Sequence, residues 1–400
     1  MSDEPAAGAT TAGDDAPGSK TESTDDGLVD RLLAGDHRAL ARTISRIENR
    51  RQGYRELVSD LYDHTGTADV IGVTGSPGAG KSTLVDKLAE TYRERGETVG
   101  VIAIDPSSPF TGGAVLGDRI RMASTVGDMD VFVRSMSARG TLGGLSTATT
   151  DAVTAMDAFG KDKVIIETVG AGQNEIDIVR TADTVAVLVP PGSGDAVQTL
   201  KAGILEIADV FVVNKADRDG ADRTVQELME MIELGEGPSF GASAGHHGPD
   251  ASGHHGTDAG GHDVGDADGH NGAHDEPERQ EPVDGDASDA TRSWQPPIVE
   301  TVATESRGID ELLDAFADHR TYLVDSGERE TRSHRRHAEE IRTLLREDLH
   351  ELLEGELDRH GGVDGLAEAV QRGETDPYTI ADDVLDPVER CLSDLDASIE

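Results

Sequence analysis

Short apolar runs separated by longer and more polar stretches make up the middle of the chain. The runs are rich in Val and Ile, as buried strands are, and they cover residues 70–73, 99–104, 131–133, 164–166, 185–189, 210–213 and 298–302. The stretches between them are typical of helices. Because strands that alternate with helices pair in the same direction, the pattern predicts an α/β fold with a mostly parallel, helix-covered sheet.

The rest of the chain divides into segments with other patterns. Residues 1–26 are rich in Ala, Gly, Thr and Asp and have almost nothing to bury, which predicts a disordered acidic tail. From 27 to 66, Leu and Ile recur at helical spacing and predict an N-terminal helical segment. The strands then belong to one domain, 67–325, and residues 326–400 combine charged helical stretches with no strand pattern.

The C-terminal segment carries a leucine-rich helical stripe, formed by Leu344, Leu345, Leu349, Leu352 and Leu353. Two or three helices are too few to bury such a stripe by themselves. We therefore expect this segment to pack on a partner subunit.

A low-complexity insertion, 235–293, interrupts the domain before its last strand. It consists mainly of Gly, His, Asp, Ala and Ser, and its histidines are His246, His247, His254, His255, His262, His270 and His274. Such a cluster could bind Ni²⁺, Zn²⁺ or Co²⁺ loosely. We favour the alternative of a solvated surface loop, because a disordered segment provides neither fixed ligand geometry nor supporting contacts.

The composition is strongly acidic. Asp and Glu number 79 against 36 Lys and Arg, for a formal net charge of −43. This charge would repel nucleic acids and anionic membranes, so neither is an expected partner. It fits a protein that stays hydrated in a salt-rich cytoplasm, where the screening length falls to about 3 Å at 1 M salt, and it suggests a halophilic host. The single cysteine, Cys391, fits a reducing compartment, and with no signal peptide or long apolar span we expect a soluble cytoplasmic protein.

A phosphate-binding loop follows the first apolar run. Its residues are Gly75, Ser76, Pro77, Gly78, Ala79, Gly80, Lys81, Ser82 and Thr83. The glycines let backbone N–H groups surround a polyphosphate, while Lys81 reaches the β and γ oxygens and the Ser82 hydroxyl ligates Mg²⁺. A chance glycine-rich turn would not explain the strand before the motif and the helix-forming residues after it. The motif therefore predicts a nucleoside triphosphatase.

The base is indicated by a second motif, Asn214-Lys215-Ala216-Asp217, directly after the run 210–213. An Asp carboxylate accepts two hydrogen bonds only from a base edge that carries a ring N–H beside an exocyclic amine, as guanine does. Asn214 would hold the other edge of the purine, and the Lys215 stem would cover its face. The expected ligand is therefore GTP. The alternative is that the motif is merely a polar strand end, which is common in proteins.

Three longer stretches lie between or beside these motifs: 105–122, 165–175 and 190–204. In these stretches the chain resembles the MeaB/ArgK-type G proteins. That family consists of SIMIBI-class P-loop GTPases associated with adenosylcobalamin-dependent methylmalonyl-CoA mutase. The similarity runs from about Gly27 to the C-terminal helices, including Asp376-Pro-Tyr, and is interrupted by the His-rich insertion.

The resemblance favours functional roles for several acids that alone could be surface carboxylates or helix caps. Asp105 and Asp118 would hold Mg²⁺ directly or through water, and Glu167 replaces the Asp usual in a switch motif. Gly170 would bring its N–H to the γ-phosphate. Lys81 and Mg²⁺ would then neutralise charge on the transferring group. The candidates for orienting the attacking water are Gln173 and Glu175.

The resemblance also extends to the base site and to a partner loop. Val302, Ala303 and Thr304 match the position where the family places backbone N–H groups against the guanine oxygen. Ser306 stands where the family often has Gly. Asp195 and Lys201 would be charged contacts on an additional switch that communicates with the mutase, with a structural ion pair as an equal alternative.

The function implied by the resemblance is a GTP-hydrolysing chaperone of an adenosylcobalamin-dependent acyl-CoA mutase that dimerises through its C-terminal helices. GTP and GDP would gate cofactor loading and release of damaged cofactor. One alternative is a nickel-insertion GTPase of hydrogenase or urease maturation, which would need ordered Cys or His ligands near the switches. The other is the older family label, an arginine/ornithine transport kinase or ATPase, which the guanine-selective Asn214 and Asp217 disfavour.

Overall fold

A seven-stranded sheet forms the centre of the protein in a computed structural model. The structure describes residues 27–105, 124, 127–137, 144–168, 181–192, 207–235 and 293–399. All strand pairs are parallel and the strand order is β3-β2-β4-β1-β5-β6-β7. The strands are β1 (Asp69–Gly75), β2 (Val99–Asp105), β3 (Val131–Ser137), β4 (Lys163–Glu167), β5 (Thr184–Val189), β6 (Val210–Asn214) and β7 (Ile298–Thr301). The fold class expected from the sequence, a P-loop α/β sheet, is confirmed.

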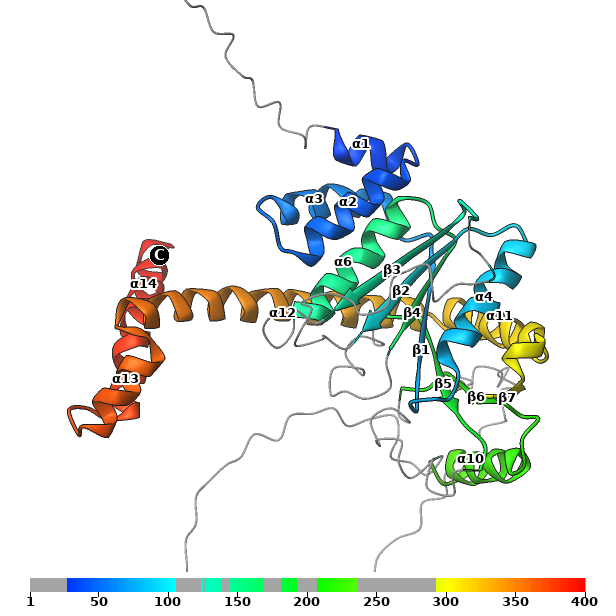
Figure 1. Cartoon of the computed structure of the whole chain (residues 1–400). Coiled ribbons are helices and arrows are strands. Elements are labelled where there is room, and N and C mark those ends of the chain that lie inside the picture. Colours follow the sequence, from blue (N-terminus) through cyan, green and yellow to red (C-terminus); the bar gives the residue numbers. More distant parts are fainter. Residues whose placement is uncertain are drawn as a thin grey trace, which may run out of the picture.

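Helices cover both faces of the sheet (Figure 1). One face packs on α4 (Lys81–Glu94) and α11 (Ile309–Asp325), and the other on α6 (Gly144–Ala158) and α10 (Ala221–Gly235). Neighbouring residues of one strand belong to opposite faces: Val70 lies in one apolar core and Ile71 in the other. This is the alternation that strand geometry imposes, and it explains why the strands read as continuous apolar runs.

The N-terminal segment forms three helices, α1 (Leu28–Leu33), α2 (His37–Glu48) and α3 (Tyr54–Leu61), followed by a 3-10 turn (Tyr62–His64). The Asp36 carboxylate caps α2 by accepting a hydrogen bond from the Arg38 N–H over 2.8 Å. Leu40, Ile44 and Ile47 of α2 are fully buried in the core that includes α6 residues. The N-terminal helices are therefore an added layer on one face of the domain.

The C-terminal segment forms a long arm. Helix α12 (Glu328–Arg359) has 32 residues, or about 48 Å at 1.5 Å per residue. It begins beside the sheet and extends away from it, with α13 (Gly362–Gln371) and α14 (Pro377–Ile399) near its far end (Figure 1). The exposed apolar side chains on α12 are Ile341, Leu345, Leu349 and Leu352. Leu344 and Leu353 of the expected stripe are instead half-buried.

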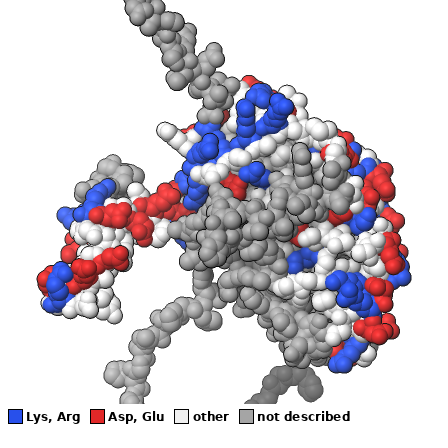
Figure 2. Space-filling view, in the orientation of Figure 1, with Lys and Arg blue, Asp and Glu red and all other residues white. Residues whose placement is uncertain are grey.

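The charge is unevenly distributed over the surface (Figure 2). Blue side chains gather over the N-terminal helices, where the arginines are Arg31, Arg38, Arg42, Arg46, Arg50, Arg51 and Arg55. The N-terminal helices therefore carry a local concentration of basic side chains on a protein whose net charge is −43. In the part of the chain that the structure describes, no helix has the length and apolar character needed to cross a membrane.

Candidate nucleotide-binding site

The phosphate loop joins the end of β1 to the start of α4 at the carboxyl edge of the sheet. Gly75, Gly78 and Gly80 have φ values of 135°, 76° and 98°, in the region that L side chains rarely adopt. A Cβ on Gly75 would lie 2.2 Å from the Leu188 carbonyl oxygen, and one on Gly80 would lie 2.5 Å from Asn214 Nδ2. The glycines are therefore required both by the backbone turn and by the close approach of β5 and β6.

The Lys81 side chain folds over this loop from the first turn of α4. Its Nζ donates to the carbonyl oxygens of Gly75 over 2.7 Å and Ser76 over 3.1 Å, and the residue is only 6% exposed. The ammonium group is thus held at the loop, as the sequence motif requires of a group that contacts phosphate oxygens.

The next residue, Ser82, donates a hydrogen bond from its hydroxyl to Oε1 of Glu167. Glu167 ends β4 next to β1 and is 4% exposed. Thr168 holds this strand end, because its N–H donates to the Val73 carbonyl and its hydroxyl to Thr74 Oγ1 over 2.9 Å. A hydroxyl and a carboxylate therefore meet beside the loop, and such oxygen donors suit Mg²⁺.

Asn214, at the end of β6, connects the two nucleotide motifs. It is 2% exposed, and its Nδ2 donates to the Ala79 carbonyl over 2.8 Å. Its Oδ1 accepts hydrogen bonds from Thr301 Oγ1 over 3.1 Å and from the Ala303 N–H over 3.2 Å. An Asn amide has two N–H donors, and among the described residues the structure gives an acceptor to one of them.

Lys215 and Asp217 follow in the turn after β6. Lys215 has a positive φ of 64° and donates from Nζ to the Gly78 carbonyl over 2.7 Å. Its stem therefore crosses above the phosphate loop. Asp217 is exposed at the surface of the same turn. The structure brings the second motif and the phosphate loop to one edge of the sheet.

Residues 302–304, which are expected to contact the guanine oxygen, follow β7 at the same edge of the sheet. The Val302 N–H donates to the Arg307 carbonyl over 3.0 Å and the Ala303 N–H donates to Asn214, so both already have acceptors within the protein. Thr304 is the exposed member of the three. Ser306 has a φ of 54°, which agrees with a position where glycine is favoured.

Several expected site residues lie outside the described residues: Asp118, Gly170, Gln173, Asp195 and Lys201, together with the His-rich insertion and the N-terminal tail. Asp105 ends β2 at the same edge of the sheet as Gly75. Sequence reasoning missed Thr168, which holds the Glu167 strand end, and the bond by which the Thr301 hydroxyl positions Asn214. The only signal for these bonds was a Thr at or beside the end of a predicted strand.

A parallel sheet with a phosphate loop and a guanine motif at its carboxyl edge defines a P-loop protein that binds a guanine nucleotide. Residues 40–358 match the family described as Methylmalonyl Co-A mutase-associated GTPase MeaB, and the chain belongs to that family. It hydrolyses GTP, as the related GTPases do.

Relatives and solved structures agree with this assignment. A GTPase-family protein of Pyrococcus abyssi is 43% identical over 90% of this chain and 95% of its own length. GTPase ArgK of Escherichia coli is 33% identical over 75% of this chain and 77% of its own length. The crystal structure of an LAO/AO transport system kinase matches with a TM-score of 0.58 at 23% identity, covering 91% of this chain and 98% of that one, and shows the shared fold.

Proposed function

We propose that this GTPase is a chaperone of an adenosylcobalamin-dependent acyl-CoA mutase of the methylmalonyl-CoA mutase type. The observation that carries the proposal is the family match over residues 40–358, combined with a phosphate loop and guanine motif assembled at one edge of the sheet. GTP hydrolysis would gate the loading of intact cofactor and the release of damaged cofactor, while the chaperone itself binds no corrin.

In this proposal the phosphate end of the site supplies positioning and charge. The loop N–H groups and Lys81 bind the β- and γ-phosphates, and Gly170 brings a further N–H to the γ-phosphate. Ser82 and Glu167, with Asp105 and Asp118, hold Mg²⁺, which would neutralise charge on the phosphates. The hydrogen bond from the Ser82 hydroxyl to Glu167 Oε1 supports this arrangement, because it brings the two oxygens that would bind Mg²⁺ together. Gln173 orients the attacking water.

The base end selects guanine. Asp217 accepts hydrogen bonds from the guanine ring N–H and amine, and the remaining Asn214 donor reaches the opposite edge. The Lys215 stem, fixed by its bond to Gly78, covers the face of the base. Backbone N–H groups of Val302, Ala303 and Thr304 would face the guanine oxygen.

Communication with the mutase would use Asp195 and Lys201 on the loop after β5, and the protein would act as a homodimer. The exposed side chains of Ile341, Leu345 and Leu349 support α12 as the dimer contact.

A copurification experiment tests the chaperone proposal. The tagged protein, loaded with GDP or with a non-hydrolysable GTP analogue, is passed through native extract and the retained proteins are identified by mass spectrometry. We expect an acyl-CoA mutase whose recovery differs between the two nucleotides, and whose purified form stimulates GTP hydrolysis. Recovery of hydrogenase or urease maturation proteins in its place would contradict the proposal.

A further inference from the structure

Helix α2 presents a basic face to solvent, formed by Arg38 and Arg42. The apolar side of the helix is buried in the domain through Leu40, Ile44 and Ile47. Arg38 and Arg42 are exposed one helical turn apart on the opposite side. Figure 2 shows that basic side chains gather over these N-terminal helices, on a protein that is otherwise strongly acidic.

The acids closest to this basic face along α2 are already paired with other arginines. The Asp36 carboxylate caps α2 and accepts a hydrogen bond of 3.1 Å from an arginine in α1. Glu48, at the end of α2, accepts from Arg134 of β3 over 2.5 Å. Neither Arg38 nor Arg42 forms an ion pair or a side-chain hydrogen bond with another residue that the structure describes. Their guanidinium groups are therefore open to another molecule.

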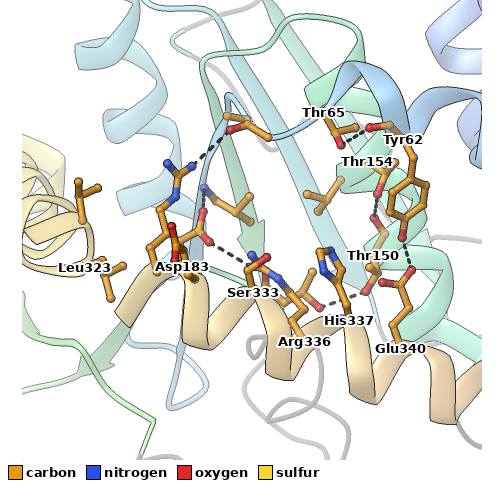
Figure 3. A pocket seen from close by; sticks show the side chains of 18 of the residues that line it. Tyr62, Thr65, Thr150, Thr154, Asp183, Leu323, Ser333, Arg336, His337 and Glu340 are labelled. Carbon is orange, nitrogen blue, oxygen red and sulfur yellow. Dashed lines mark hydrogen bonds and ion pairs between the residues drawn. The ribbon is translucent and has the colours of Figure 1, made fainter. Parts of the chain in front are cut away.

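Other polar side chains of the N-terminal segment are occupied by the arm. Arg50, after α2, donates to the buried Glu347 of α12 over 2.8 Å. The Tyr62 hydroxyl donates to Glu340 of α12 over 2.6 Å, and Figure 3 shows this pair beside a cavity of about 440 Å³ that both residues help to line. These residues therefore make contacts within one chain, whereas the basic face of α2 does not.

The basic face has a cost in local helix stability. Arg38 lies in the first turn of α2, where the helix dipole favours negative side chains, and this turn contains no acid. Arg42 follows four residues later, so two like charges are neighbours on one side of the helix, and this spacing is unfavourable. Carboxylates of another molecule placed against Arg38 and Arg42 would relieve both effects.

The basic face lies away from the nucleotide edge. At the start of α2, the His37 ring lies 4.9 Å from the Phe159 ring and 6.4 Å from the Phe132 ring, measured between centroids. Phe132 is the second residue of β3, and Phe159 follows α6 just before β4 begins, so both mark the amino-terminal edge of the sheet. The phosphate loop and the guanine motif lie at the carboxyl edge. A partner on the basic face would therefore bind without contacting the nucleotide.

We propose that the basic face of α2 is a docking site for a carboxylate-rich surface of a partner protein. Exposed guanidinium groups on adjacent turns can each bind a carboxylate through paired hydrogen bonds. A folded partner can place a few acids against this face alone, whereas a net charge of −43 repels a long polyanion such as a nucleic acid over the whole molecule. Identification of the partner as the acyl-CoA mutase rests on the proposed function, but the carboxylate chemistry does not.

The test reverses both charges in the double variant Arg38→Glu/Arg42→Glu. Its matched control is Arg223→Glu/Arg335→Glu, because these arginines are exposed on α10 and α12 and the net charge changes by the same amount. The probe is a labelled poly-glutamate peptide, titrated at low salt, where surface charges are least screened. We expect the wild type and the control to bind it, and the test variant to bind at least about tenfold more weakly, since reversal turns attraction into repulsion.

Thermal stability separates docking from a structural role. The substitutions place an acid in the first turn of α2 and a second acid four residues before Arg46, and both changes favour the helix. The test variant should therefore melt at or above the wild-type temperature, with basal GTP hydrolysis unchanged. A lower melting temperature together with lost binding would overturn the proposal, because the arginines would then support the fold. Absence of wild-type binding, or equal binding by the wild type and the test variant, would also overturn it.

Two further measurements identify the partner. A poly-uridine RNA tests the other class of ligand: tighter binding of this RNA than of the peptide, lost in the test variant, would contradict a protein partner. Repeating the copurification with the test variant should lower mutase recovery and leave its nucleotide dependence in place. Unchanged mutase recovery would overturn docking of the mutase at this face. Failure of the wild type to recover a mutase would instead contradict the proposed function, while the peptide titration would still decide the docking chemistry.

Discussion

The side-chain amide of Asn214 donates to the carbonyl oxygen of Ala79 over 2.8 Å, although the two residues are 135 positions apart in the sequence. The guanine motif is therefore part of the phosphate loop's support. The same side chain also accepts from Thr301 and Ala303, so it joins the phosphate loop, β6 and the end of β7 at the nucleotide edge. Loss of this side chain should affect the loop as well as the base.

The first prediction concerns this amide. Asn214→Ala leaves the Ala79 carbonyl and the Ala303 N–H without partners, and each unsatisfied buried group costs about 1–3 kcal/mol. We expect a free energy of unfolding lower by several kcal/mol in nucleotide-free protein, measured in urea, together with weaker GDP and GTP binding. Asn49→Ala is the control, because among the described residues the Asn49 side chain bonds only to the Ser45 carbonyl, at an exposed helix end. Normal stability with weakened nucleotide binding would show that Asn214 has no role in supporting the loop.

The second prediction concerns Lys81. Removing a preorganised cation from the transferring phosphate costs about 10²–10³-fold or more in rate, so Lys81→Ala should abolish measurable GTP hydrolysis in single-turnover assays. Lys87→Ala is a suitable control, since Lys87 lies on the same helix and pairs with Glu90. A Lys81 variant with wild-type turnover would place catalysis elsewhere.

The third prediction concerns base selection. Asp217→Ala removes two charge-assisted hydrogen bonds, and GTP binding should weaken by about 3 kcal/mol or more while ATP binding does not weaken. Competition titrations of both nucleotides measure this. Asp219→Ala, another exposed acid in the same turn, should behave as the wild type. Equal affinity of the wild-type protein for ATP and GTP would overturn the role of Asp217.

The fourth prediction is a pH dependence of stability. Asp151 on α6 is 6% exposed, and burial together with Glu340 raises its pKa to about 7. The charge of Glu347 also raises this pKa, and the charges of Arg50 and Arg55 oppose the shift. A raised folded pKa means that the folded protein binds the extra proton. The stabilisation is complete below the unfolded value of about 4, and it is lost as the pH rises through about 7, at about 1.4 kcal/mol per pH unit in between.

Asp151→Asn removes this titration while keeping the shape of the side chain. The decrease in the free energy of unfolding from pH 5 to pH 8, measured in urea, should therefore be smaller in the variant than in the wild type. Asp60→Asn, at an exposed position on α3, should leave the decrease unchanged. Equal decreases in Asp151→Asn and the wild type would show that Asp151 titrates normally.

Local patterns were sufficient to predict the sheet, and long-range contacts were not. Each apolar run lies in an observed strand because a buried parallel strand needs apolar residues on both faces, and only Val302 falls outside, in a bridge with Arg307. The phosphate loop could be predicted because its glycines adopt positive φ values that other residues rarely adopt. In contrast, the bonds from Asn214 to Ala79 and from Arg332 to Asp209 join distant segments, and no spacing along the chain encodes them.

The last prediction concerns assembly through α12. Truncation near Asp325 would remove Arg332 from the buried Asp209, so a point substitution is the cleaner experiment. Leu345 and Leu349 are 58% and 51% exposed on one stripe of α12. In a dimer that buries them, Leu345→Glu would place an unpaired charge in an apolar contact, which is strongly destabilising, whereas in a monomer it would be nearly neutral. Sedimentation equilibrium should therefore show a dimeric wild type and a monomeric Leu345→Glu variant that still binds GTP. Arg346→Glu changes charge at the adjacent, exposed position and should remain dimeric. A Leu345→Glu variant that stays dimeric would place the interface away from this stripe, and a monomeric wild type would contradict the dimer itself.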